Sequence, residues 1–227
     1  MARPNDGNFC NRFGGCSPEL LDRLGGDLTN QHEQLDELRR SLDLLPEEIA
    51  LDQVVPILVP VLLADNGEWP GPIALMRTPE LAVTWACLLP AQTMLYVNFK
   101  TVQFWENNGL DWRRQSMENL ARMSEQISSH SFQREGGAPY GLVMMQDDGI
   151  GPSRLLLNEW LEEVFPEGYW VAIPERSVGF VLSRTALPEE REKVERLVVE
   201  CFEKGSQPLK REMFVPDLLT AMSSECH

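Results

Sequence analysis

The sequence predicts an α+β fold in which a twisted, mainly antiparallel sheet is covered by helices, with an N-terminal helical extension. Short apolar runs separated by turn residues fill the region from 54 to 99, and this spacing is typical of antiparallel strands. A strand, turn, helix, strand, turn, strand pattern follows between 140 and 183. Capped helical segments stand at 101–129 and 188–204. Elements grouped in this way within 227 residues indicate an α+β chain with a substantial core.

The first 50 residues differ in character from the rest. Residues 1–16 are rich in Gly, Asn and Pro and show no periodicity, which predicts a mobile arm. Residues 17–50 predict a helical segment, because Ser17 and Asp27 are suitable N-caps. The remaining residues, 51–227, form the predicted α+β domain.

Leucines recur at helical spacing along one face of the N-terminal segment. We expect this stripe to be buried either against the protein's own sheet or against a second copy of the chain. The second alternative predicts a homodimer, for which a closed two-fold arrangement is the commonest form. The stripe consists of Leu28, Leu35, Leu38, Leu42 and Leu45.

Four apolar runs in the first half of the domain predict strands. The first run contains Pro56 and Pro60, which have no amide hydrogen to donate, so it is expected at a sheet edge or at a bulge. The four expected strands cover residues 54–63, 73–76, 81–89 and 94–99.

Three helices are expected in the rest of the domain. A short one at 101–109 ends at Asn108 and Gly109, and a longer one covers 111–129. The last, at 188–204, has glutamates in its first turns and Gly205 just after its end. A short strand at 212–215 and a small terminal helix follow. The buried face of the helix at 111–129 is expected to carry Trp112, Ser116, Leu120, Met123 and Ile127.

The net charge of −15, from 35 acidic and 20 basic residues, bears on possible partners. A surface this negative repels phosphate backbones, which argues against nucleic-acid binding, and it suits a basic protein partner. A solvated acidic surface with no binding role is the alternative. The chain has no apolar run long enough for a membrane span and no apparent secretory signal, so we expect a cytoplasmic protein without a membrane partner.

Cysteine and histidine patterns do not predict a metal centre, and no cofactor is expected. The chain has five scattered cysteines and three histidines, none at zinc-ligand spacing. Reduced, mostly buried thiols are expected, and Cys87 reads as part of a buried strand. No Ser, His and Asp set and no nucleophile motif is present, so no catalytic residue is assigned and an enzyme is the less favoured class.

The most informative segment begins with Asp147 and Asp148 and continues as GIGPSR. Two adjacent carboxylates can ligate a divalent cation, but the next four residues offer no further side-chain oxygen. Asp and Gly also form tight turns, and Ser153 is then a natural helix N-cap. Both alternatives remain at this point.

Arg154, Asn158 and Glu162 are spaced four residues apart on the helix predicted after this turn. Such a line is either solvated, with weak pairing between its members, or directed at a cleft. The core side of the same helix is expected to consist of Leu155, Leu156, Trp160, Leu161 and Val164.

Arg176 lies in a predicted hairpin turn, Pro174 to Ser177, between two apolar runs. Its guanidinium either pairs with Asp147 or Asp148 across the sheet or binds an anionic ligand through two hydrogen bonds. The candidate ligand-binding residues are therefore Asp147, Asp148, Arg154, Asn158 and Arg176.

The segments DDGIGPSRLLL and YWVAIPERSVGFVL, with Asn158 and Trp160 between them, resemble the C-terminal half of the YtpQ-like bacterial proteins. The segment YVNFKTVQFWENNGLDWRRQSMENL is similar to the middle of those proteins, so the resemblance covers about residues 50–215. Ser177 stands where that family usually has Asp. The resemblance implies an α+β cytoplasmic protein and no particular reaction.

Two functions are compatible with these observations. The favoured one is a non-enzymatic, cytoplasmic protein-binding or regulatory module, for example an acidic inhibitor or immunity-like protein that masks a basic partner. The alternative is a small-ligand-binding protein or enzyme that uses the polar cluster near Asp147, Arg154 and Arg176.

Overall fold

The computed structural model describes residues 49–65, 69–89, 93–125, 130–135, 137–145 and 148–221. The predicted arm, nearly all of the N-terminal helical segment and its leucine stripe lie outside these residues, so the homodimer stays a prediction. Asp147 and Ile127 also lie outside them. Among the described residues, no helix is long and apolar enough to cross a bilayer.

The first sheet is antiparallel and has β3 (Leu81–Leu89) at its centre. Strand β1 (Val54–Pro60) pairs along one side of β3, while β2 (Ala74–Leu75) and β4 (Thr93–Tyr96) pair with its other side. Because β3 is the only strand partner of β1 among the described residues of this sheet, β1 is an edge strand there, as its two prolines predict.

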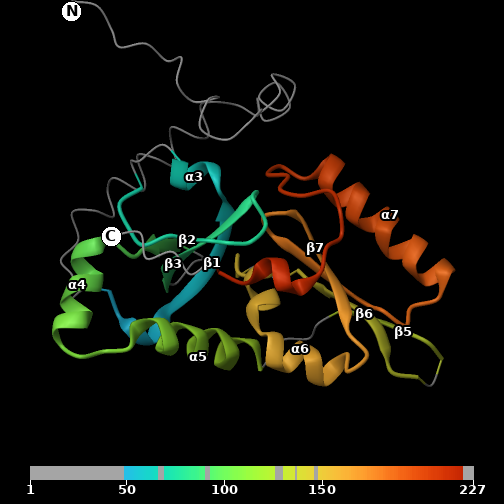
Figure 1. Cartoon of the computed structure of the whole chain (residues 1–227), viewed down its shortest axis with the longest axis horizontal. Coiled ribbons are helices and arrows are strands. Elements are labelled where there is room, and N and C mark those ends of the chain that lie inside the picture. The colour runs from blue at the N-terminus through green and yellow to red at the C-terminus, as the bar shows by residue number, and fades with distance from the viewer. Residues whose placement is uncertain are drawn as a thin grey trace, which may run out of the picture. The chain divides into compact units, whose positions relative to one another are not determined.

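The second sheet is antiparallel and has the order β5-β6-β8-β7. Its strands are β5 (His130–Gln133), β6 (Pro139–Met144), β7 (Tyr169–Glu175) and β8 (Val178–Ser183). The predicted hairpin turn is confirmed, because Arg176 and Ser177 connect β7 to β8. The α+β class and the antiparallel pairing are confirmed, with the strands divided between two sheets of four (Figure 1).

The helix expected at 101–109 begins earlier, at Phe99, and the helix expected at 111–129 covers Trp112–Ser124. Asn98 caps α4 (Phe99–Asn107) by accepting a hydrogen bond from Thr101 N at 2.9 Å. Asp111 caps α5 (Trp112–Ser124) in the same way. The last α-helix, α7 (Pro188–Lys204), has the predicted bounds. The other helices are α3 (Leu62–Asp65), α6 (Asn158–Val164) and the 3-10 helices η2 (Leu51–Gln53), η4 (Pro152–Leu156) and η5 (Pro216–Leu219).

Two of the expected elements have different forms. The first apolar run leaves the sheet after β1 and forms α3, so the strand expected at 54–63 is shorter than predicted. The strand expected at 212–215 is a single bridge between Phe214 and Val171. Both differences occur where the chain passes to a sheet edge. A few hydrogen bonds to a neighbouring strand are enough there to pair the backbone N–H and C=O groups.

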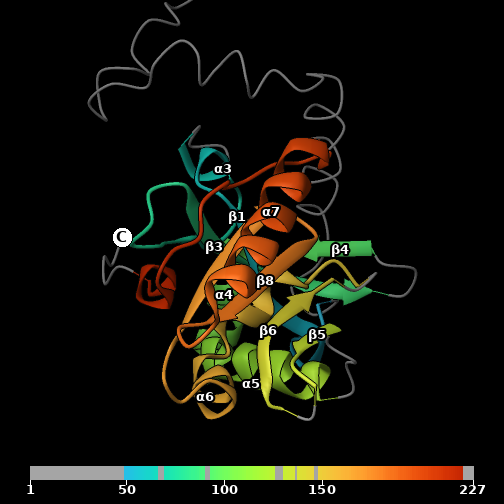
Figure 2. The ribbon, with the colours of Figure 1, turned by 90° about the vertical axis from the view of Figure 1, so that its right-hand side faces the viewer.

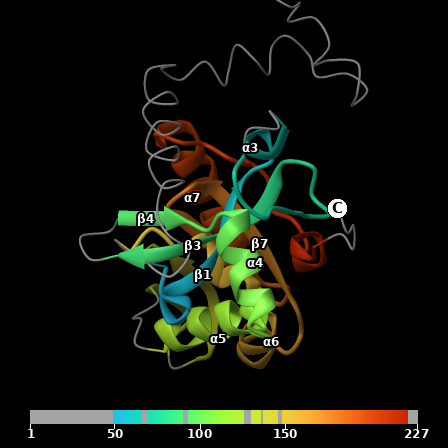
Figure 3. The ribbon, with the colours of Figure 1, turned by 90° about the vertical axis from the view of Figure 1, so that its left-hand side faces the viewer.

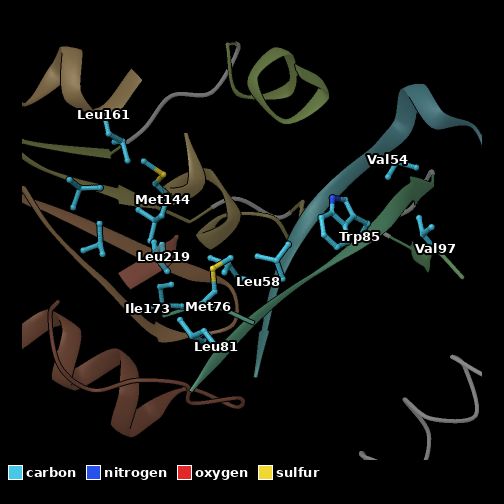
Figure 4. Packing of buried hydrophobic residues seen from close by; sticks show 14 of the residues in the cluster. Val54, Leu58, Met76, Leu81, Trp85, Val97, Met144, Leu161, Ile173 and Leu219 are labelled. Atoms are coloured by element: carbon cyan, nitrogen blue, oxygen red, sulfur yellow. The ribbon is translucent and has the colours of Figure 1, made fainter. Parts of the chain in front are cut away.

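The largest core cluster is formed by residues from both sheets (Figure 4). Leu58, Leu81 and Trp85 belong to the first sheet, and Met144 and Ile173 belong to the second. The opposite face of the first sheet packs against Leu120 of α5, and the opposite face of the second packs against Val194 and Val198 of α7. Strand residues that alternate between two buried faces explain the nearly continuous apolar runs in the sequence.

The helices lie on the outer faces of the two sheets. Helix α7 packs on β7 and β8 (Figure 2), and α5 packs on β1 beside α4 (Figure 3). The predicted buried face of α5 is confirmed at Trp112, Ser116 and Leu120. Ser116 is buried there because its hydroxyl accepts a hydrogen bond from Trp85 Nε1 at 3.0 Å.

Residues 205–221, which we term the C-terminal strap, connect the two sheets. Phe214 and Val171 exchange two backbone hydrogen bonds of 2.8 Å along the free edge of β7. Further along the strap, Leu218 O accepts a backbone hydrogen bond of 3.1 Å from Thr78 N. Thr78 lies in the segment that connects β2 to β3 of the first sheet. The strap thereby covers an edge of the second sheet that would otherwise present unpaired backbone groups.

Glu190 of α7 supplies a prediction about pH. Its carboxylate accepts two hydrogen bonds of 2.6 Å from Arg134 and one of 2.7 Å from Leu187 N. The Arg134 bond is the main cause that holds the pKa of Glu190 below the ordinary value of 4.5. A lowered folded-state pKa stabilises the fold above the unfolded-state pKa, and this contribution is lost as the pH falls through the folded-state value.

We therefore expect the Glu190→Gln variant to be less stable than the natural chain at pH 7, with the difference shrinking as the pH falls below about 4.5. Urea denaturation at a series of pH values measures it. The exposed neighbour Glu192 provides a control, since Glu192→Gln removes the same charge without breaking that pair. A difference between natural chain and Glu190→Gln that grows on acidification would contradict the assignment.

Candidate functional site

Four of the five predicted ligand-binding residues lie within the described residues, and two of them are directly bonded. Arg154 Nη1 donates to Asp148 Oδ1 at 3.1 Å, and Arg154 Nη2 donates to Asp148 Oδ2 at 2.5 Å. The Arg154 side chain is 2% exposed and that of Asp148 is 34% exposed. This bidentate pair joins the turn after β6 to η4. The charge of Arg154 is therefore compensated by a carboxylate of the same chain.

The predicted polar line of Arg154, Asn158 and Glu162 is wrong because the helix is interrupted. The chain forms η4, leaves helical geometry at Leu157 with φ −82° and ψ 63°, and starts α6 at Asn158. Arg154 is therefore buried on a separate element, whereas Glu162 is exposed on α6. Trp160 was expected in the core and is instead 39% exposed, since the interruption changes which face of α6 is buried.

Ser153 was predicted to be a helix N-cap, and this is also wrong. It is the second residue of η4, and its hydroxyl accepts a hydrogen bond of 3.2 Å from Leu58 N on β1. The partner is 95 residues away in the sequence, so no local pattern could reveal it.

Glycines in the same segment allow η4 to pack tightly between β1 and β8. A Cβ on Gly151 would lie 2.6 Å from Met144 O and 2.8 Å from Ser177 O. A Cβ on Gly179 of β8 would lie 3.2 Å from Pro152 Cα. Gly149 has φ +72°, which favours glycine in this turn. The Asp and Gly content of this segment is thus explained by a close-packed structural junction, which we term the η4 junction (residues 148–156).

Arg176 does not bond to Asp148, which is the expected carboxylate that lies among the described residues. Its Nη2 donates to Tyr96 Oη at 2.6 Å and its Nη1 donates to Gln207 Oε1 at 3.2 Å. Tyr96 in turn packs edge-on against Trp69, with ring centroids 5.0 Å apart. Arg176 therefore links the hairpin turn to β4 and to the C-terminal strap.

Glu175 is a buried carboxylate that the sequence did not single out. It accepts hydrogen bonds from Ser177 N at 2.8 Å, from the Ser177 hydroxyl and from Ser206 Oγ at 3.4 Å. These neutral donors satisfy the carboxylate where it closes the β7–β8 hairpin against the strap. A glutamate next to a hairpin turn carries no sequence signal that distinguishes it from a solvated one.

The surface of α6 and the turn after it concentrates acidic groups. Residues 155–175 contain five glutamates and no lysine or arginine. Four of these glutamates are exposed, and none forms an ion pair with another described residue. On α7, by contrast, Glu190 pairs with Arg134 and Glu195 with Arg191. We term the set the α6 acidic surface: Glu159, Glu162, Glu163 and Glu167, with Trp160 exposed among them.

Tyr169, the first residue of β7, is buried beside this surface. It is 2% exposed, and its hydroxyl has no hydrogen-bond partner among the described residues. Burial raises the pKa of Tyr169 to about 12, with smaller contributions from the charges of Glu162 and Asp217. The Oδ1 atom of Asn158 is likewise buried without a partner in the described part of the chain.

The thiols in the described residues have little nucleophilic character. Cys87 and Cys201 are both free, and burial is the main cause that raises the pKa of each. A raised pKa lowers the fraction of reactive thiolate near neutral pH. Among the described residues, no group of three or more His, Cys, Asp or Glu side chains could hold a metal ion.

Comparisons with protein-family models, with curated proteins and with solved structures find no match to this chain. The resemblance to the YtpQ-like proteins therefore stays a prediction.

Proposed function

We propose that this chain is a non-enzymatic, cytoplasmic protein-binding or regulatory module whose partner is a basic protein. The observation that carries the proposal is the α6 acidic surface, where four exposed glutamates lack a cation partner among the described residues. A local concentration of negative carboxylates attracts and orients a positively charged partner. An inhibitor or immunity-like protein that masks a basic surface is the concrete form we favour.

Trp160 strengthens the argument for a protein partner. It is 39% exposed on a seven-residue helix whose other exposed side chains are polar. Tryptophan is enriched among the residues that contribute most to protein–protein affinity, because its large ring buries apolar area with little loss of rotamer freedom. An aromatic ring surrounded by carboxylates also suits a lysine or arginine through cation–π contact.

The hydrogen bonds of the candidate ligand-binding residues weigh against the alternative of a small-ligand site. Asp148 and Arg154 bind each other, and Arg176 binds Tyr96 and Gln207. A ligand at these residues would first have to break hydrogen bonds that hold the two sheets together. The polar groups of Asp148, Arg154 and Arg176 are therefore best assigned to stability.

A charge-neutralised variant tests the proposed function. In the quadruple variant Glu159→Gln, Glu162→Gln, Glu163→Gln and Glu167→Gln, we expect at least a ten-fold weaker affinity for a basic protein partner at low salt. The natural partner is first recovered by affinity capture of the tagged full chain at low and at moderate salt, and its affinity is then measured by titration calorimetry.

The matched control neutralises four exposed glutamates elsewhere, so that both variants carry the same net charge. Loss of affinity in both variants alike would indicate attraction by overall charge and contradict a role for α6. Failure to recover any partner at either salt concentration would contradict the proposal itself. The control substitutions are Glu125→Gln, Glu135→Gln, Glu192→Gln and Glu212→Gln.

A further inference from the structure

We propose that the indole ring of Trp160 receives an arginine side chain of the partner protein, whose guanidinium stacks on the ring and pairs with Glu163. The inference rests on the proposed function, because it names the side chain by which a basic partner is recognised on the α6 acidic surface. Attraction by charge alone does not distinguish lysine from arginine, whereas an aromatic ring beside a carboxylate does.

The exposed ring of Trp160 is the first step of the argument. Trp160 lies on α6 and is 39% exposed. It makes no hydrogen bond, ring contact or cation contact with another described residue. A partner's side chain can therefore reach the ring, and the indole offers a large apolar face for such a contact.

The other tryptophans of the chain show which group suits such a ring. The Cζ atom of Arg113 lies 4.3 Å from the ring centroid of Trp112. The Cζ atoms of Arg184 and Arg191 lie 5.4 Å and 5.9 Å from the ring centroid of Trp170. The cations found over tryptophan rings among the described residues are thus guanidinium groups. At Trp160 such a group has to come from another molecule.

Lysine ammonium groups lie over smaller rings in the same chain. Lys193 Nζ is 5.6 Å from the ring centroid of Phe132, and Lys210 Nζ is 5.8 Å from that of Phe214. The difference has a physical reason, because the planar guanidinium is weakly hydrated and stacks flat on the wide indole, whereas an ammonium group is compact and strongly hydrated. Arginine is therefore the side chain that Trp160 fits best.

Glu163 supplies a carboxylate for the same guanidinium. It follows Trp160 by three residues on α6, and side chains at this spacing are neighbours, with Cβ atoms about 5–6 Å apart. Helical side chains lean toward the N-terminus of their helix, so the carboxylate leans toward Trp160. Glu163 is exposed and forms no ion pair with another described residue. A guanidinium on the ring can donate two hydrogen bonds to it, which an ammonium group cannot do in the same plane.

The test is a calorimetric titration of the full chain at low salt with two peptides of equal length and equal net charge. The peptides differ only in having arginine or lysine at every basic position. We expect the natural chain to bind the arginine peptide about three-fold more tightly or better. In Trp160→Leu the affinity for the arginine peptide should fall about five-fold, and the preference for arginine should disappear.

Two carboxylate variants check the role of Glu163. Glu163→Gln should reduce the preference for arginine. Glu162→Gln is the matched control, because it removes the same charge from α6 two residues from Trp160, and side chains two apart on a helix do not face each other. We expect this control to weaken both peptides equally. Equal preference for arginine in Glu163→Gln and in the natural chain would overturn the pairing with Glu163.

The contact at the ring has a direct readout as well. The indole N–H signal of Trp160 is identified by its absence from the NMR spectrum of Trp160→Phe, and it should shift on addition of the arginine peptide. Because Trp160 is exposed, Trp160→Leu should unfold in urea as the natural chain does. Equal weakening of both peptides in Trp160→Leu would show that the ring contributes only apolar area and would overturn the assignment to arginine.

The outcomes separate this inference from the proposed function. If the quadruple glutamine variant of α6 loses affinity for both peptides and the natural chain shows no preference for arginine, the acidic surface stands and the arginine contact is rejected. If the natural chain binds neither peptide at low salt, both proposals fail.

Discussion

The Gly151→Ala variant is expected to lose about 3 kcal/mol or more of the free energy of unfolding. The added Cβ would lie 2.6 Å from Met144 O and 2.8 Å from Ser177 O. Both neighbours are backbone atoms, so relief requires η4 to move away from the second sheet. The conformation of Gly151 is ordinary right-handed helical, with φ −45°, and the cost is therefore steric.

Urea denaturation of the full chain measures this effect, and the soluble fraction on expression reports it if the variant does not fold. Gly137→Ala is the matched control, because a Cβ there meets the Arg134 Cβ at an ordinary 3.4 Å. We expect the control to change stability by about 0.5 kcal/mol or less, or to stabilise slightly through the unfolded state. Similar stabilities for the two variants would show that the η4 junction is not close-packed.

The Asp148→Ala variant is expected to lose about 3 kcal/mol. The substitution removes both hydrogen bonds that Asp148 accepts from the buried guanidinium of Arg154, and it also removes the bond of 3.1 Å that Ile150 N donates to Asp148 Oδ1. Removal of Asp148 leaves the buried charge of Arg154 poorly compensated, and this is costlier than the loss of an exposed pair.

The exposed pair of Arg114 and Glu118 on α5 provides the comparison, with side chains 68% and 50% exposed. We expect Glu118→Ala to change the free energy of unfolding by about 0.5 kcal/mol or less. Chemical denaturation of the two variants under the same buffer and salt measures the difference. A loss below about 1 kcal/mol for Asp148→Ala would mean that this pair contributes no more than a surface ion pair does.

Elements with strong local signals could be predicted from the sequence. Strand β3 and helix α7 have the predicted bounds. For α7 the reasons are local, since Pro188 fits the first helical turn and Gly205 follows its end. The edge position of β1 was also predictable, because proline restricts pairing wherever it occurs.

The interruption at Leu157 could not be predicted, because no proline or glycine marks it. The 3-10 geometry of η4 is imposed by its packing between β1 and β8, and these contacts join residues far apart in the sequence. The burial of Arg154 has the same origin, since helical periodicity alone places an arginine on the solvent side. The pairing of Arg154 with Asp148 was therefore not predicted from the sequence.

The bonds of Arg176 show a second limit. Its partner Tyr96 is 80 residues away, on a strand of the other sheet. The sequence indicated which runs form strands, but the division of these strands between two sheets depends on pairings at long range.

The C-terminal strap has a consequence for synthesis of the protein on the ribosome. Residues 205–221 are translated after every strand of both sheets, yet they pair with β7 and with the segment around Thr78. A nascent chain that has emerged only as far as Gly205 therefore exposes the edge of β7 and lacks the hydrogen bonds that the strap makes to both sheets. The pairing of β7 with the strap is completed only after α7 has left the exit tunnel. Until the strap emerges, the open edge of β7 is available to other nascent chains.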